Sequence, residues 1–311
     1  MPLTSDSGEA ASLSPDDTFT LLGNETRLEI LRALWEAYEP YEPDTAVPFS
    51  DLFDRVGIGD TGNFNYHLGQ LTDHFVRRTD AGYELTGPGF KIVHAIVAGT
   101  TTENPILEPT VVAASCPRCE CPVEIVYTDG TIWARCTDCD GYWPRRQGEI
   151  FGFTLPPEGL RDRRPDEILE ATIVYSIHRF ESMSDGVCPE CSGSVSASLA
   201  VCPDHDPADG VCDECDSYFL GVITLVCGSC KFAWRSPSWA PVHHHPALVS
   251  FYDDHDVEHV LDGWDAMKRS FDWHEELVCL DPPRLQITVP CDSDELTLVL
   301  DETGTVVDHR R

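Results

Sequence analysis

The residues of this chain best suited to chemistry are cysteines that come in pairs separated by two residues. The first four are Cys116, Cys119, Cys136 and Cys139. Between them, residues 123–128 and 131–135 predict a β-hairpin, with Asp129-Gly130 as a type I′ turn that brings the two pairs face to face. Four thiolates converging on one point satisfy a tetrahedral zinc ion and leave no open position. We therefore predict a closed structural zinc site.

A second group of pairs offers eight more ligands, which predict two further metal ions in two alternative pairings. In the nested pairing, residues 194–201 and 218–226 form a hairpin that joins Cys188 and Cys191 to Cys227 and Cys230. Its tip then closes a second site from Cys202, His205, Cys212 and Cys215. In the sequential pairing, the first four and the last four of these ligands each form one site. Strand lengths favour nesting, and a single zinc with spare thiols is a third reading, so we expect two or three structural Zn²⁺ ions.

The other cysteines and histidines carry weaker signals. Cys121 lies too close to Cys119 to act as a fifth ligand, and Cys279 and Cys291 alternate with apolar residues as buried strand positions do. We interpret His255 and His259, four residues apart in an expected helix, as solvated rather than metal-binding. Nothing in the chain matches a phosphate loop, a nucleophile elbow or a zinc-protease motif, so we expect no enzyme.

Composition restricts the class of protein further. The chain has 311 residues, 54 Asp and Glu against 21 Lys and Arg, and a net charge of −33, and only three of its basic residues are lysines. Acidic residues spread along the whole chain, together with so few lysines, resemble the composition of proteins from extreme halophiles. At molar salt the Debye length is only about 3 Å, so net charge does not prevent an approach to DNA. Because no long apolar run or basic leader is present, we expect a cytoplasmic protein.

The elements before the first cysteine follow one plan. Apolar residues at helical spacing predict helices in residues 15–35, 49–56, 63–75 and 88–97, and Asp80-Ala81-Gly82 predicts a hairpin between the last two. This order is that of a winged helix-turn-helix. The chain resembles the ArsR-type family of transcriptional regulators over residues 15–100. The resemblance rests on Leu22-Gly23-Asn24-Glu25-Thr26-Arg27-Leu28-Glu29-Ile30-Leu31 and on Asn63-Phe64-Asn65-Tyr66-His67-Leu68.

The resemblance implies a DNA-binding regulator that acts as a homodimer on double-stranded DNA. The helix from residue 63 would enter the major groove and the hairpin would reach the backbone or the minor groove. The candidate DNA contacts are Asn63, Asn65, Tyr66, His67, Gln70, Arg77 and Arg78. Metal sensors of that family hold the metal within the winged helix, but residues 1–110 contain no cysteine, so metal sensing is not implied. The alternative is a winged-helix and zinc-ribbon interaction module of the transcription machinery, without its own operator.

We therefore expect a multidomain α+β protein of the halophile ArsR-like group. It would contain a winged helix-turn-helix, two zinc-ribbon-like β modules joined by a helix, and a C-terminal helix plus antiparallel sheet. The expected segments are a disordered tail (1–14), the winged helix (15–100), the first zinc ribbon (101–160), a connecting helix (161–183), the second zinc-binding module (184–242) and the C-terminal α+β domain (243–311).

Overall fold

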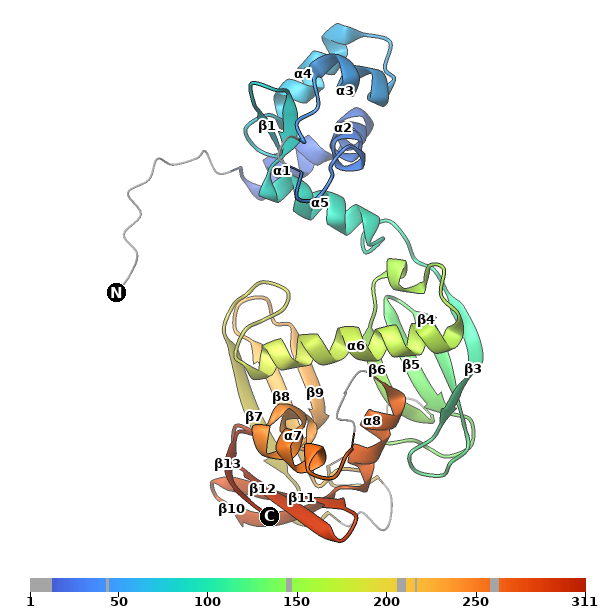
Figure 1. Cartoon of the computed structure of the whole chain (residues 1–311), viewed down its shortest axis with the longest axis vertical. Helices are drawn as coiled ribbons and strands as arrows, with labels where there is room; N and C mark the ends of the chain where they lie inside the picture. Colours follow the sequence, from blue (N-terminus) through green and yellow to red (C-terminus); the bar gives the residue numbers. More distant parts are fainter. Residues whose placement is uncertain (1–12, 43–44, 144–146, 206–210, 216, 258–262) are drawn as a thin grey trace, which may run out of the picture. The chain divides into compact units, whose positions relative to one another are not determined.

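A computed structural model describes residues 13–42, 45–143, 147–205, 211–215, 217–257 and 263–311 (Figure 1). The chain divides into two compact units, Met1–Thr102 and Glu103–Arg311. It is a mixed α+β protein, with a two-stranded sheet in unit 1 and three larger antiparallel sheets in unit 2. Most of the tail expected at 1–14 lies outside the described residues.

Unit 1 is helical with one short hairpin. Its elements are α1 (Pro15–Leu22), α2 (Glu25–Glu36), α3 (Phe49–Val56), α4 (Thr61–Leu71), β1 (Val76–Arg78), β2 (Tyr83–Leu85) and α5 (Gly87–Val97). Polar caps set the helix starts: the side chains of Asn24, Asp60 and Thr86 accept backbone N–H groups of the following turn. The core is apolar and cysteine-free, and its fully buried residues include Ile30, Leu31, Leu52, Phe64 and Leu71.

The helix expected over 63–75 is shorter at one end and longer at the other. It begins at Thr61, because Asp60 accepts the N–H groups of Gly62 and Asn63 at 2.8 and 3.2 Å. It ends at Leu71, because Thr72 adopts an extended backbone (ψ 142°) and its hydroxyl donates to the Leu68 carbonyl at 2.8 Å. Residues 72–75 are therefore a turn into the hairpin, not helix.

The described residues of unit 2 form three antiparallel sheets, in each of which the strands pair in sequence order. The first comprises β3 (Leu107–Ser115), β4 (Pro122–Thr128), β5 (Thr131–Cys136) and β6 (Glu149–Thr154). The second comprises β7 (Val195–Val201), β8 (Gly221–Cys227) and β9 (Ala233–Pro237). The third comprises β10 (His274–Leu280), β11 (Pro283–Cys291), β12 (Asp294–Leu300) and β13 (Val306–Arg310), so the antiparallel sheet expected at the C-terminus is confirmed.

The helices of unit 2 pack onto these sheets. They are η1 (Pro157–Leu160), α6 (Pro165–Ser184), η3 (Ala240–His244), α7 (Pro246–Asp253), α8 (Trp264–Arg269) and η4 (Ser270–Asp272). The long α6 packs against β3 and β6 of the first sheet and β7 of the second, and so spans both (Figure 1). No described helix is both long and apolar enough to cross a membrane.

One hydrophobic core runs through the whole of unit 2. It joins Ile125 and Ile132 of the first sheet to Leu225 of the second and Leu298 of the third. Helix α8 also returns to the first sheet, where Trp264 Nε1 donates to the Ser115 carbonyl at 3.0 Å. The segments expected as two zinc modules and a C-terminal domain thus share a single interior.

Some unit 2 elements differ from the expectation. The segment before Cys116 contributes the nine-residue strand β3 to the first sheet, and strands β6 and β9 were not predicted. The helical stretch expected after residue 246 forms two short helices, α7 and α8, and His255 lies in a turn beyond the end of α7. His259 lies outside the described residues. Cys279 and Cys291 are half-buried because β10 and the end of β11 lie at the rim of the third sheet.

Candidate metal centres

Twelve Cys and His residues converge in three groups, each with its four ligand atoms within 4.8 Å of one another. The groups are Cys116, Cys119, Cys136 and Cys139; Cys188, Cys191, Cys227 and Cys230; and Cys202, His205, Cys212 and Cys215. Each group could hold one metal ion. The pairing of the second and third groups is the nested one.

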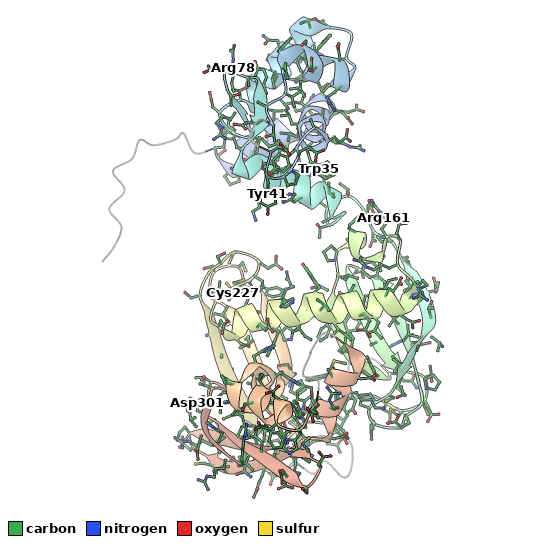
Figure 2. The ribbon with its side chains drawn as sticks, viewed as in Figure 1. Trp35, Tyr41, Arg78, Arg161, Cys227 and Asp301 are labelled. Carbon is green, nitrogen blue, oxygen red and sulfur yellow. The ribbon has the colours of Figure 1, made fainter. Side chains whose placement is uncertain are left out.

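Hairpins bring the cysteine pairs together. In the first sheet, β4 and β5 are joined by Asp129 and Gly130, whose φ values of 49° and 73° are those of a type I′ turn. This register places Cys136 opposite Val123, next to the turn that contains Cys116 and Cys119. In the second sheet, Cys227 lies opposite Val195 across β7–β8, just after the Cys188/Cys191 turn. Figure 2 labels Cys227 in this position.

The turns that carry the cysteine pairs share one backbone geometry. In four of the six pairs, the N–H of the first residue donates to the carbonyl five residues later: Cys116 to Cys121, Cys188 to Gly193, Cys212 to Ser217 and Cys227 to Phe232, at 2.8–2.9 Å. In three of these, the residue directly after the second cysteine has a φ near +60°: Glu120, Ser192 and Lys231. The positive φ closes the turn so that both sulfurs face the same side.

Sulfur spacing in the two four-cysteine groups excludes disulfides. Cys116 Sγ lies 3.7 Å from Cys139 Sγ, and Cys119 Sγ lies 3.4 Å from Cys136 Sγ. The corresponding distances are 3.6 Å for Cys188–Cys230 and 3.5 Å for Cys191–Cys227. A disulfide would need about 2.05 Å. The thiols therefore surround a point instead of bonding in pairs.

The third group uses a histidine whose orientation is set by a second hydrogen bond. His205 Nε2 donates to the Tyr218 carbonyl at 3.0 Å, which leaves Nδ1 directed at Cys215 Sγ, 3.5 Å away. Holding one ring nitrogen on a carbonyl is the usual way in which proteins present the other nitrogen to a metal. Cys202 Sγ and Cys212 Sγ complete the group at 4.0 Å from each other.

The thiols within each group have separated pKa values. Backbone N–H groups of Cys230 and Ser229 lower the pKa of Cys227 to about 6. Burial raises the pKa of Cys116, and burial together with hydrogen bonds to Cys212 and Cys202 raises the pKa of Cys215 to about 12. One thiolate forms readily, whereas further negative charges beside it are unfavourable. A cation at the centre of each group would relieve this repulsion.

A matched family model decides which family this chain represents. The domain of unknown function DUF7351 matches residues 113–306. The chain belongs to the DUF7351 family. A second model, the domain of unknown function DUF7347, matches residues 15–96. No curated protein matches the chain, and no solved structure does.

All twelve clustered residues lie inside the DUF7351 match, together with two residues that sequence reasoning missed. Arg118, between the first two cysteines, donates to the Gly141 carbonyl at 3.1 Å and stacks on the Tyr218 ring at 5.2 Å. Because the Tyr218 carbonyl also holds His205, the first and third groups share Tyr218 as a neighbour. The cation–π geometry depends on a contact 100 residues apart in sequence, which no local motif signals.

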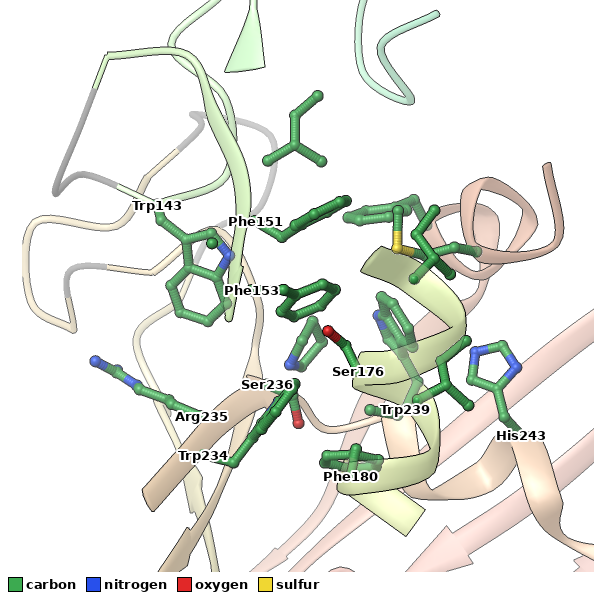
Figure 3. A pocket seen from close by; sticks show the side chains of 18 of the residues that line it. Trp143, Phe151, Phe153, Ser176, Phe180, Trp234, Arg235, Ser236, Trp239 and His243 are labelled. Carbon is green, nitrogen blue, oxygen red and sulfur yellow. The ribbon is translucent and has the colours of Figure 1, made fainter. Parts of the chain in front are cut away.

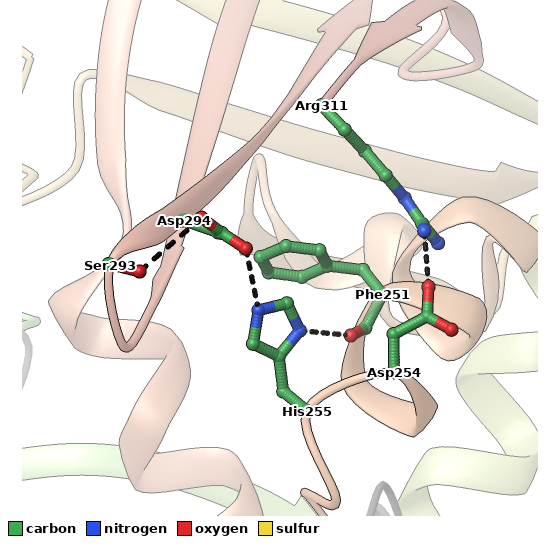
Figure 4. Close-up of polar contacts among 6 residues, drawn as sticks. All are labelled: Phe251, Asp254, His255, Ser293, Asp294 and Arg311. Atoms are coloured by element: carbon green, nitrogen blue, oxygen red, sulfur yellow. Dashed lines mark hydrogen bonds and ion pairs between the residues drawn. The ribbon is translucent and has the colours of Figure 1, made fainter.

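The DUF7351 match also covers a smaller group, His255, Cys291 and Asp292, with three ligand atoms within 4.8 Å. Here the two histidine nitrogens face the Phe251 carbonyl at 2.7 Å and Asp294 Oδ2 at 3.2 Å (Figure 4). The hydrogen bond to the Phe251 carbonyl raises the pKa of His255 most, and the hydrogen bond to Asp294 raises it by a smaller amount. Both ring nitrogens therefore already face an oxygen of the protein, and these contacts compete with metal binding. Cys119, Cys121 and Asp138 form a further such group beside the first centre.

The residues expected to contact DNA lie in the DUF7347 match. Asn63, Asn65, Tyr66 and Gln70 are exposed along α4, whereas Phe64, Leu68 and Leu71 face the core. His67 is half-buried, and its Nδ1 has no hydrogen-bond partner among the described residues. Burial and the nearby Arg27 charge lower its pKa. His67 therefore turns partly inward, away from the exposed row.

The hairpin residues Arg77 and Arg78 are both exposed, and they differ in their partners. Arg77 forms an ion pair with Glu84 across β1–β2 at 2.7 Å. Arg78 projects from the hairpin, and its guanidinium lies 6.0 Å from the Tyr83 ring centroid (Figure 2).

Proposed function

We propose that this protein is a DNA-binding transcriptional regulator in which unit 1 is a winged helix-turn-helix and unit 2 is held by three structural zinc ions. The element order of unit 1 supports the winged-helix assignment: α2, α3 and α4 precede the β1–β2 hairpin, and α5 follows it. In such folds the helix before the hairpin enters the major groove. That helix would be α4.

The observation that carries the proposal is the chemistry of the exposed face of α4. Among the described α-helices, α4 is the one with no charged side chain, in a protein with 24% charged residues. Its solvent-facing side chains are Thr61, Asn63, Asn65, Tyr66 and Gln70, all of them uncharged. Asn and Gln read adenine edges with paired hydrogen bonds, and the absence of carboxylates removes repulsion from phosphates. A surface kept free of acid in so acidic a chain supports a nucleic-acid partner.

A specific observation also favours the second candidate, a protein-interaction module without its own operator. Residues 15–100 hold 14 acidic and six basic side chains, and Arg77 already pairs with Glu84. Phosphate neutralisation, which provides most non-specific DNA affinity, is correspondingly small here. Sequence-specific contacts would have to supply most of the binding.

The zinc assignment rests on geometry and ligand type. Zn–S bonds of about 2.3 Å in a tetrahedron place sulfurs about 3.8 Å apart, close to the 3.4–3.7 Å between sulfurs in the two four-cysteine groups. Four protein ligands leave no position for water, so these ions would hold structure and would not catalyse a reaction.

A homodimer bound to a two-fold DNA site completes the proposal.

Chromatin immunoprecipitation of the tagged full chain in its native salt tests the function. The protein is compared with the triple variant Asn63→Ala/Asn65→Ala/Gln70→Ala and with Glu29→Ala, an exposed change on α2. We expect sharp peaks that share a short motif, retained in Glu29→Ala and lost in the triple variant. Each lost paired contact to adenine is worth about 1–3 kcal/mol, so the loss is large.

Two outcomes would count against DNA reading. Peaks at every active promoter without a common motif would favour the interaction module. Unchanged occupancy of the triple variant, with its fold intact by circular dichroism, would remove α4 from the DNA interface.

A further inference from the structure

Unit 2 contains a cavity of about 180 Å³ that the metal centres and the DNA proposal do not use. Strand β6 contributes Phe151 and Phe153, and helix α6 contributes Ser176 and Phe180 (Figure 3). Strand β9 and the segment after it contribute Trp234, Ser236 and Trp239. The wall therefore forms only where α6 bridges the first and second sheets.

Aromatic rings line this cavity in mutual contact. Phe151 and Phe153 stack with centroids 4.2 Å apart and an interplanar angle of 18°. Phe153 lies 5.3 Å from Trp234, which lies 6.0 Å from Phe180. Phe153 and Trp234 are only half-buried, so the cavity is reached from solvent past these two rings. Flat apolar walls of this kind accept a planar ring by stacking or by edge contact.

Two buried hydroxyls in the wall have no hydrogen-bond partner in the part of the chain that the structure describes. Ser176 is 1% exposed and Ser236 is 7% exposed, and neither Oγ has a hydrogen-bond partner among the described residues. One turn earlier on α6, the Thr172 hydroxyl donates to the Ile168 carbonyl at 2.7 Å, so the helix can satisfy such a group. The Ser176 side chain instead reaches into the cavity beside Phe153 (Figure 3). An unpaired buried hydroxyl costs about 1–3 kcal/mol, which a ligand's polar group would recover.

Size and charge define the class of ligand. A cavity of about 150 Å³ accommodates benzene, so this one fits a single substituted ring or a compact bicycle. The buried Glu149 carboxylate lines the same wall and disfavours an anion. The lining cation, Arg235, is exposed and lies over Trp143 at 5.6 Å, outside the apolar interior.

We propose that this cavity is a binding site for a small neutral aromatic molecule that carries a hydroxyl or ring N–H, with Ser176 and Ser236 as its hydrogen-bonding partners. Phenol and indole have the size and polarity that the cavity predicts. The aromatic residues supply the contact area, and the serines select ring compounds with a polar group over purely hydrocarbon ones.

Isothermal titration of the zinc-loaded full chain tests this site with phenol, indole and toluene as probes and tetramethylammonium as the cationic comparison. The variants are Ser176→Ala, which removes one hydroxyl; Ser176→Leu, which fills the cavity; and Ser184→Ala, a control at the end of α6 outside it. Zinc content and circular dichroism report whether each variant is folded.

We expect one phenol or indole per chain, bound more tightly than tetramethylammonium. Ser176→Ala should weaken phenol about tenfold, the effect of one hydrogen bond, and leave toluene unchanged. Ser176→Leu should abolish binding of all three rings, and Ser184→Ala should behave as the unmodified protein. Equal losses for phenol and toluene in folded Ser176→Ala would overturn the role of the hydroxyl. Tighter binding of tetramethylammonium than of phenol, or no ring binding up to the solubility limit, would overturn the proposal.

Discussion

The two units of this chain differ in the interactions that can stabilise them. Unit 1 contains no cysteine and buries a core built by helices close in sequence, with Phe64 packed between Phe49 and Phe53. Unit 2 holds all 14 cysteines, and its three groups of four candidate metal ligands lie in turns and at strand ends of the first two sheets. Helices satisfy their backbone within themselves, whereas short hairpins need further stabilisation at their open ends.

This contrast assigns different roles to different residues in the two units. In unit 1, single buried side chains carry the stability, and the exposed face of α4, which we propose contacts DNA, takes no part in the core. In unit 2, metal ligation would hold the sheets in place, and α6 can then bridge them without filling the whole interior. The cavity beside Ser176 is a consequence of that scaffold.

Loss of a metal site should give the largest difference in stability between the two units. Structural zinc supplies about 10–16 kcal/mol to small domains, so we expect Cys136→Ser to lose one zinc per chain and the protection of β4 and β5 amides from hydrogen exchange. Unit 1 amides should keep their protection. Cys279→Ser, a half-buried cysteine outside all metal groups, serves as the control. Fewer than three zinc ions per folded chain, by elemental analysis, would contradict the assignment of zinc to all three groups.

A core truncation in unit 1 should give the opposite pattern. Phe64 is fully buried, and replacing a buried phenylalanine with alanine costs about 3–5 kcal/mol through lost contacts and a cavity. We expect Phe64→Ala to lower the denaturation midpoint of unit 1 and leave zinc content unchanged. Tyr66→Ala, on the exposed side of the same helix, should shift stability by less than about 0.5 kcal/mol. A loss of zinc from Phe64→Ala would show that the units are not independent.

The smallest effect concerns a buried carboxyl in unit 2. The Glu275 carboxylate accepts hydrogen bonds from Ser238 Oγ and from the Leu220 N–H, the latter at 2.9 Å. Burial raises the pKa of Glu275 to about 7, although these hydrogen bonds act to lower it. A raised carboxyl pKa gives stability that is complete below the unfolded value near 4.5 and is lost as the pH rises through 7. Glu275→Gln should therefore gain stability relative to the unmodified protein between pH 5.5 and 8, by at most about 3 kcal/mol.

Urea denaturation of both proteins at each pH measures this difference, because proton release from the metal ligands affects the two equally. Glu276→Gln, at an exposed position on the same strand, is the matched control and should show no such trend. A stability difference for Glu275→Gln that does not change with pH would contradict the burial of an ionisable carboxyl.

Local features of the molecule could be predicted from short stretches of sequence. The Asp129-Gly130 turn and the four C-terminal strands follow from turn chemistry and alternation, and the structure has them. Strands β6 and β9 were missed because each is short and its apolar residues pack against α6 and other distant elements. The strand propensity of five or six residues carries no information about packing partners that are distant in sequence.

The sequence by itself determined most of the turns that carry the cysteine pairs, because four of the six turns close through a hydrogen bond between residues only five apart. It also determined the apolar and polar faces of α4, since helical periodicity depends on neighbouring residues alone. Only the tertiary structure decided between the nested and sequential pairings, because the register of β7 against β8 selects which turns meet. It alone also assembled the aromatic cavity, whose lining spans Trp133 to Phe271 and has no common motif.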